Sequence, residues 1–138
     1  MNVKAIIAAT TLLVAAATAA SAHHAVNAQF DITKNVAAMG VLERIELINP
    51  HTYMYFTVTE PNGAARKFSM ETGAPIALKR AGLSIRDNMK VGETYKLVYS
   101  PSRNGSATGL LTAITLPDGR FIAFGGKNNV DAARELSK

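Results

Sequence analysis

Short runs of alternating apolar and polar residues fill the chain from residue 36 to residue 124, a pattern typical of β-strands with one buried face. The clearest run is HTYMYFTVTE at residues 51–60, in which Tyr53 and Tyr55 lie opposite the apolar positions. Further strands are predicted at residues 36–48, 66–71, 94–100, 109–116 and 120–124. Strict alternation in the run 109–116 places on one face Leu110, Thr112, Ile114 and Leu116.

One segment breaks this pattern and has helical spacing instead. Pro75 suits a first helical turn and Gly82 suits the position just past the end, so a short helix is predicted over residues 75–81. Gly40 lies inside the first run, where a glycine indicates a bend or bulge. Three strands, a helix and two or three further strands predict a mainly β fold, an OB-like barrel of five to six strands. A small β-sandwich or another small barrel is the alternative, because the spatial order of strands is not written in one sequence.

The first 22 residues have the order of a secretory signal peptide. Lys4 provides a basic start, an apolar run continues to about Ala17, and the small residues Ala20 and Ala22 suit a cleavage site. The apolar run is shorter than the roughly 20 residues of a membrane-spanning helix. We therefore expect an exported or secreted protein, with no membrane insertion after the signal is removed.

Four segments are predicted along the chain. They are a signal peptide at 1–22, an extended leader at 23–35, the barrel domain at 36–126 and a polar C-terminal tail at 127–138, which is either a frayed helix or disordered.

Composition narrows the classes of function. The net charge of +5 is scattered along the chain, whereas nucleic-acid binding usually shows a basic stripe, so no nucleic-acid partner is predicted. The absence of cysteine excludes disulfides, zinc-thiolate sites and iron–sulfur clusters. No pair of carboxylates has a distinctive spacing, and no serine lies in a G-x-S-x-G context, so we predict no catalytic activity.

The histidines provide the strongest candidate chemistry. Cleavage after Ala22 makes His23 the first residue, whose α-amine and imidazole chelate one metal, and a second imidazole completes a three-nitrogen site that favours Cu(II). The second imidazole is His24 or His51, and we favour His51 because His24 follows directly in sequence. Cleavage after Ala20 would instead place His23 third, where amine, amide and ring nitrogens bind Cu(II) or Ni(II).

The length of the leader limits this copper site. A straight strand from Val36 to His51 would measure roughly 50 Å at about 3.3 Å per residue, whereas the leader from His23 to Asn35 spans at most about 43–47 Å. The site therefore requires a first strand that bends at Gly40 and a leader that folds back along it. The alternative is a solvated His-His terminus and a His51 that hydrogen-bonds a loop carbonyl.

A candidate binding loop lies between two of the predicted strands, where Asn-Pro commonly begins a turn. It consists of Asn49, Pro50, Tyr53 and Tyr55, next to His51. Together with Tyr95 and Tyr99, the two loop tyrosines would provide an aromatic platform of the kind on which OB-folds stack ligands. Turn chemistry and cross-strand packing are the structural alternatives.

Several short motifs along the chain include the histidines and the candidate binding loop. They are His-His at 23–24, F-D-x-x-K at 30–34, Asn-Pro-His at 49–51, L-x-R-x-G at 78–82 and P-x-R-x-G at 101–105. In this combination the chain resembles a family of small exported bacterial proteins catalogued as a domain of unknown function. The resemblance implies family membership and a periplasmic address, and no activity. The leading hypothesis is a small periplasmic binding protein that holds Cu(II), and the alternative is a metal-free module that binds a peptide, a glycan or a periplasmic protein.

Overall fold

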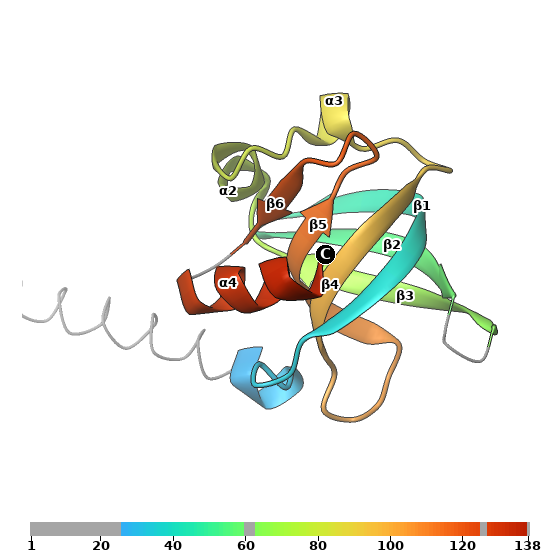
Figure 1. Ribbon diagram of the computed structural model, residues 1–138, viewed down its shortest axis with the longest axis vertical. Helices are drawn as coiled ribbons and strands as arrows, with labels where there is room; N and C mark the ends of the chain where they lie inside the picture. The colour runs from blue at the N-terminus through green and yellow to red at the C-terminus, as the bar shows by residue number, and fades with distance from the viewer. Residues whose placement is uncertain (1–25, 60–62, 125–126, 138) are drawn as a thin grey trace, which may run out of the picture.

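The structure is a computed structural model that describes residues 26–59, 63–124 and 127–137, with the side chains of 127–129 left out (Figure 1). Its strands are β1 (Val36–Ile48), β2 (His51–Thr59), β3 (Ala65–Thr72), β4 (Thr94–Pro101), β5 (Thr108–Thr115) and β6 (Phe121–Ala123). Its helices are α2 (Pro75–Arg80), α3 (Ile85–Asn88) and α4 (Lys127–Leu136), and residues 26–29 form a further helical turn.

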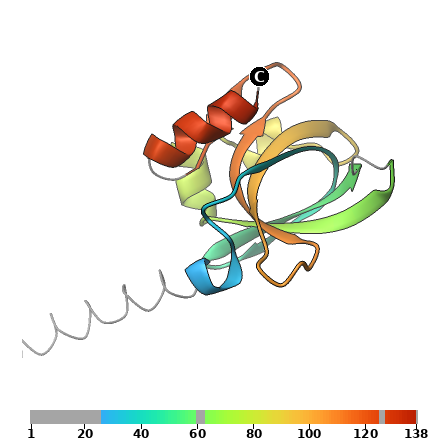
Figure 2. The same ribbon diagram turned by 60° about the horizontal axis from the view of Figure 1, so that its bottom comes forward.

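The strands close into a barrel, as the sequence predicts. Their order is β3-β2-β1-β4-β5-β6 with antiparallel neighbours, and a parallel pairing of β3 with β5 joins the first and fifth strands of that row. Figure 2 shows the closed barrel, and Figure 1 labels the extra strand β6 beside β5. This is the strand order of an OB-fold, and the predicted mainly β, OB-like architecture is confirmed.

Alternation along β2 and β3 decides which side chains fill the barrel. Met54, Phe56 and Val58 of β2 and Phe68 and Met70 of β3 are buried in the interior, while the intervening residues face outward. The faces predicted for the run 51–59 are therefore confirmed.

The bend in β1 combines a change of partner with a bulge. β1 pairs with β4 through its first half and with β2 through its second half, and Gly40 pairs with both Tyr95 and Val58. The break in register falls between Leu42 and Arg44, so the bulge follows the glycine at which the sequence predicts the bend. The β-carbon of an alanine at Gly40 would lie 2.9 Å from a methyl carbon of Leu97, so glycine permits close packing at this position.

The faces predicted for β5 are wrong in part. Leu111 and Ile114 belong to the barrel core, whereas Leu110 is half-buried and outside that cluster. The reason is a register shift, in which Val98 pairs with Ala113 but the next residue of β4 pairs with Leu111. The extra residue in β5 reverses the alternation, which sequence periodicity alone cannot reveal.

The segment between β3 and β4 covers one end of the barrel. The predicted helix at 75–81 corresponds to α2, and its Leu78, with Leu83, packs into the core. The four-residue helix α3 follows and was not predicted.

The segment predicted as a polar tail contains α4, which packs outside β5 and β6, with Ala133 against Val98 and Ala113 (Figure 1). Within the described ranges, every helix is too short or too polar to cross a membrane.

Candidate functional site

A histidine–glutamate pair lies on the outer face of the barrel at the turn between β1 and β2. His51 is the first residue of β2, and its Nδ1 lies 2.8 Å from Oε1 of Glu71 on the neighbouring strand β3. The imidazole is 41% exposed and the carboxylate only 14% exposed. With Nδ1 donating to the carboxylate, the neutral ring presents the lone pair of Nε2.

Tyr53 lies next to this pair. Its ring centroid is 6.3 Å from that of His51, and its register partner on β3 is Glu71. Burial, and then the negative charge of Glu71, raise the pKa of the Tyr53 hydroxyl. The tyrosine hydroxyl therefore stays neutral near neutral pH.

Further along the same face, Tyr55 is held by two charged side chains. The Arg44 guanidinium lies 3.5 Å above the centre of the Tyr55 ring. The Tyr55 hydroxyl donates to Glu46 Oε2 at 2.9 Å, and Arg44 Nε donates to Glu46 Oε1 at 3.0 Å. These two hydrogen bonds lower the pKa of the Glu46 carboxyl.

The four tyrosines do not form one platform. Tyr95 and Tyr99 belong to the barrel core, at 0% and 6% exposure, whereas Tyr53 and Tyr55 are half-buried on the outer face. The hypothesis of a shared aromatic surface is therefore wrong, and the alternative of packing holds for Tyr95 and Tyr99, because side chains of β4 at odd positions point into the barrel. A groove of about 220 Å³ lies beside Tyr55 and Arg44, between β1, β2 and β3.

A second group of contacts, the leader clasp, joins residues 27–34 to residues 101–103. Phe30 forms an antiparallel bridge with Ser102 and is 1% exposed. The backbone N–H of Asp31 donates to the carbonyl of Pro101 at 2.9 Å. The F-D-x-x-K and P-x-R-x-G motifs, far apart in sequence, thus meet in space.

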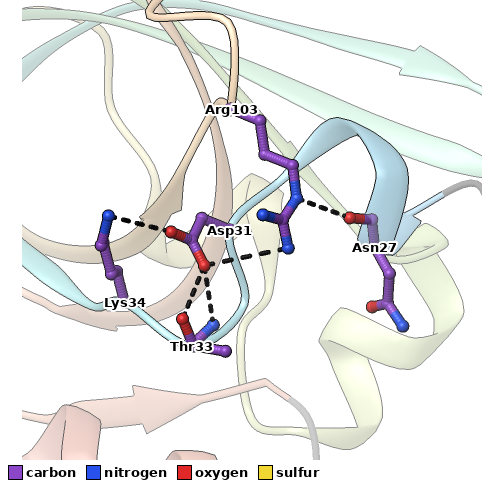
Figure 3. Close-up of polar contacts among 5 residues, drawn as sticks. All are labelled: Asn27, Asp31, Thr33, Lys34 and Arg103. Carbon is purple, nitrogen blue, oxygen red and sulfur yellow. Dashed lines mark hydrogen bonds and ion pairs between the residues drawn. The ribbon is translucent and has the colours of Figure 1, made fainter.

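Side chains complete the leader clasp (Figure 3). Arg103 donates through Nε to the carbonyl of Asn27 at 2.8 Å, and its guanidinium lies 3.9 Å from Asp31. Asp31 also accepts the Thr33 hydroxyl at 2.6 Å and lies 3.1 Å from Lys34 Nζ. The Thr33 hydrogen bond, followed by Lys34, lowers the pKa of Asp31 to about 2.

We expect Thr33→Val to raise the pKa of Asp31 towards its ordinary value of 3.8, because it removes the hydrogen bond that stabilises the carboxylate most. A pKa depressed in the folded state means that Asp31 stabilises the fold above pH 3.8, and that this contribution is lost as the pH falls towards 2. A carboxyl-carbon NMR titration measures the shift. Asp118, whose pKa is lowered by Arg120, is the internal control. An unchanged Asp31 midpoint in the variant would contradict the assigned cause.

The other predicted site residues are placed as follows. Asn49 and Pro50, joined by a cis peptide, form the turn before His51, whereas His23 and His24 lie outside the described residues. Among the described residues, no three histidine or carboxylate side chains converge as a metal site. Glu71 was not predicted as a site residue, although alternation places it on the outward face of its strand.

Strand pairing relates the leader clasp to the His51–Glu71 pair. Glu71 pairs with Leu110 of β5, Leu110 pairs with Ser100 of β4, and Ser102, just after the end of β4, pairs with Phe30. Three steps of about 4.8 Å between strands, combined with the two-residue offset of about 7 Å from Ser100 to Ser102, give roughly 16 Å along the barrel wall. The closed barrel thus brings the leader much nearer to His51 than the contour of β1 suggests.

Comparison with known families gives a match to the model of a family of unknown function (DUF6152) over residues 9–112. Comparisons with curated proteins and with solved structures give no match. The matched residues include β1 to β4, the His51–Glu71 pair and both sides of the leader clasp. Since the match extends over more than half of its length, the chain belongs to DUF6152, a family of unknown function.

Proposed function

We propose that this chain is a small exported binding protein that holds Cu(II) between its mature N-terminus and His51. Cleavage after Ala22 gives His23 a free α-amine beside its own imidazole, and His51 provides the third nitrogen. Three nitrogen ligands in a tetragonal arrangement favour Cu(II). The observation that carries the proposal is the exposed His51 imidazole, oriented through Nδ1 by Glu71.

The Glu71 carboxylate beside His51 supports a role of His51 as a metal ligand in two ways. Histidines that ligate metals usually donate their other ring N–H to a carboxylate or carbonyl, which fixes the ring and increases its basicity. The Glu71 charge, 2.8 Å from the ring, also favours a cation nearby. A histidine that served only to close the turn would need neither feature.

The reach of the leader supports the same proposal. Residues 26–29 are helical and contribute about 6 Å at 1.5 Å per residue, and residues 23–25, if extended, add about 10 Å. The total of about 16 Å is comparable to the roughly 16 Å between Phe30 and Glu71 along the barrel wall. The leader is therefore long enough for His23 to approach His51.

A Cu(II) titration of the processed protein tests the proposal. We expect His51→Ala to weaken binding at least tenfold, and Glu71→Gln to weaken it about tenfold, as is usual for the hydrogen-bond partner of a ligand. A Gly-Gly-Pro extension before His23 should also weaken binding at least tenfold, because it converts the α-amine to an amide without placing a histidine third. The competing site that an extension of one or two residues would create is thereby avoided.

Glu46→Gln is the matched control, since Glu46 is an outward carboxylate that contacts Arg44 and Tyr55 rather than His51. It should leave copper affinity unchanged. Binding that persists in both His51→Ala and the extended protein would refute the proposed ligand set, as would binding that falls equally in Glu46→Gln.

A second candidate function is a metal-free interaction module. The observation that favours it is the groove of about 220 Å³ beside the Arg44–Tyr55 stack, on the outer face of β1 to β3. An arginine fixed over a tyrosine presents a preorganised surface to a peptide, a glycan or a protein. Absence of copper binding in the processed protein would favour this candidate.

A further inference from the structure

A pocket of about 410 Å³ lies between α2 and the strands β5 and β6, and none of its lining residues belongs to the His51–Glu71 pair. Ala77 and Leu78 of α2 form one wall, Leu110 and Leu111 of β5 another, and Phe124 lies just after β6. Its size is within the range of about 300–1,000 Å³ of sites for small ligands.

The lining of this pocket selects against charge. Among the described residues that line it, none has an ionisable side chain, and most are aliphatic, aromatic or glycine. An ionised group placed there would lose water without gaining a partner, which is strongly unfavourable. The chemistry of the wall therefore fits a neutral, largely apolar molecule.

One buried polar group in the wall has no partner. Thr72 lines the pocket at the end of β3, is 2% exposed, and its Oγ1 forms no hydrogen bond with any described residue. A buried hydroxyl without a partner destabilises a protein. Rotation about χ1 to another staggered position turns the Thr72 hydroxyl to a new direction, so a polar atom of a ligand would satisfy it.

We propose that this pocket binds a small neutral molecule with an apolar body and one hydroxyl or carbonyl group, which hydrogen-bonds to Thr72. The register partner of Thr72, Thr52, also has a buried hydroxyl with no partner among the described residues, but Thr52 does not line the pocket. Substitution of each threonine in turn therefore separates the effect of a buried hydroxyl on stability from the effect of a ligand contact on binding.

An NMR titration with 1-octanol, 2-octanone and octanoate tests the proposal on the full processed protein. We expect octanol and octanone to shift the amide signals of Gly73, Ala77 and Leu111, and octanoate to bind at least tenfold more weakly. Thr72→Val should weaken octanol binding about fivefold, because one neutral hydrogen bond to the ligand is lost. It should also raise Tm, because it removes a buried hydroxyl that has no partner. Thr52→Val should raise Tm without changing octanol affinity.

A second pair of variants tests the location. Ala77 is exposed on α2 and lines the pocket, so Ala77→Phe should fill it and abolish octanol binding. Ile76→Phe, at the neighbouring exposed position that does not line the pocket, should leave binding intact. The proposal is overturned if octanol does not bind, if octanoate binds equally well, or if Ala77→Phe or Thr72→Val leaves octanol affinity unchanged.

Discussion

Gly109→Ala should lower the free energy of unfolding by about 3 kcal/mol, the upper part of the range for overpacking in a core. A β-carbon at Gly109 would lie 2.5 Å from Cδ2 of Tyr99 and 3.0 Å from Sδ of Met70. Tyr99 cannot easily yield, because its ring is buried and packs 5.7 Å from that of Phe68, centroid to centroid. Gly109 also pairs with both β3 and β4, so the clash falls where the barrel closes. Urea denaturation measures the loss.

Gly73→Ala is the matched control for this substitution. The nearest atom to its added β-carbon would be Cβ of Ala77 at 3.7 Å, an ordinary contact. We expect a change within about 0.5 kcal/mol. Equal stability of the two variants would mean that the packing at the β3–β5 closure tolerates a methyl group, contrary to the structure.

Periodicity predicts the strands of this barrel well where their interior positions are strongly apolar. The run 51–59 shows why, since Met54, Phe56 and Val58 are almost fully buried and the residues between them are not. The same reasoning fails in β5, where one extra residue opposite Val98 and Tyr99 reverses the faces. A bulge changes pairing without leaving a distinct pattern of side chains, so only the structure reveals it.

The candidate site depends on the register between β2 and β3, which the alternation of apolar and polar residues does not determine. Alternation places His51 and Glu71 on the outward faces of their strands, but a slip of two residues would preserve those faces and separate the pair. The contact between Asp31 and Arg103 likewise requires the leader to lie beside the β4–β5 loop. The sequence displays both motifs of the leader clasp, yet their contact depends on the complete barrel.

Phe30→Ala should lower the free energy of unfolding by about 3 kcal/mol, as expected when a buried phenylalanine is truncated. Phe30 is 1% exposed although it precedes the barrel, and its backbone pairs with Ser102. Its side chain therefore supplies the apolar part of the leader clasp, whose charged contacts are partly exposed and contribute little by themselves. Urea denaturation measures the loss, and limited proteolysis should show faster cleavage near residues 26–34.

Ile32→Ala provides the comparison within the same leader, because Ile32 is 38% exposed. It should change the free energy of unfolding by less than about 1 kcal/mol and leave the rate of proteolysis nearly unchanged. If the leader must be docked for His23 to approach His51, Phe30→Ala should also weaken Cu(II) binding, and Ile32→Ala should not. If Phe30→Ala keeps its stability and its leader resists proteolysis, backbone pairing alone holds the leader clasp. If the leader is cleaved faster but copper affinity is unchanged, the metal ligands lie elsewhere.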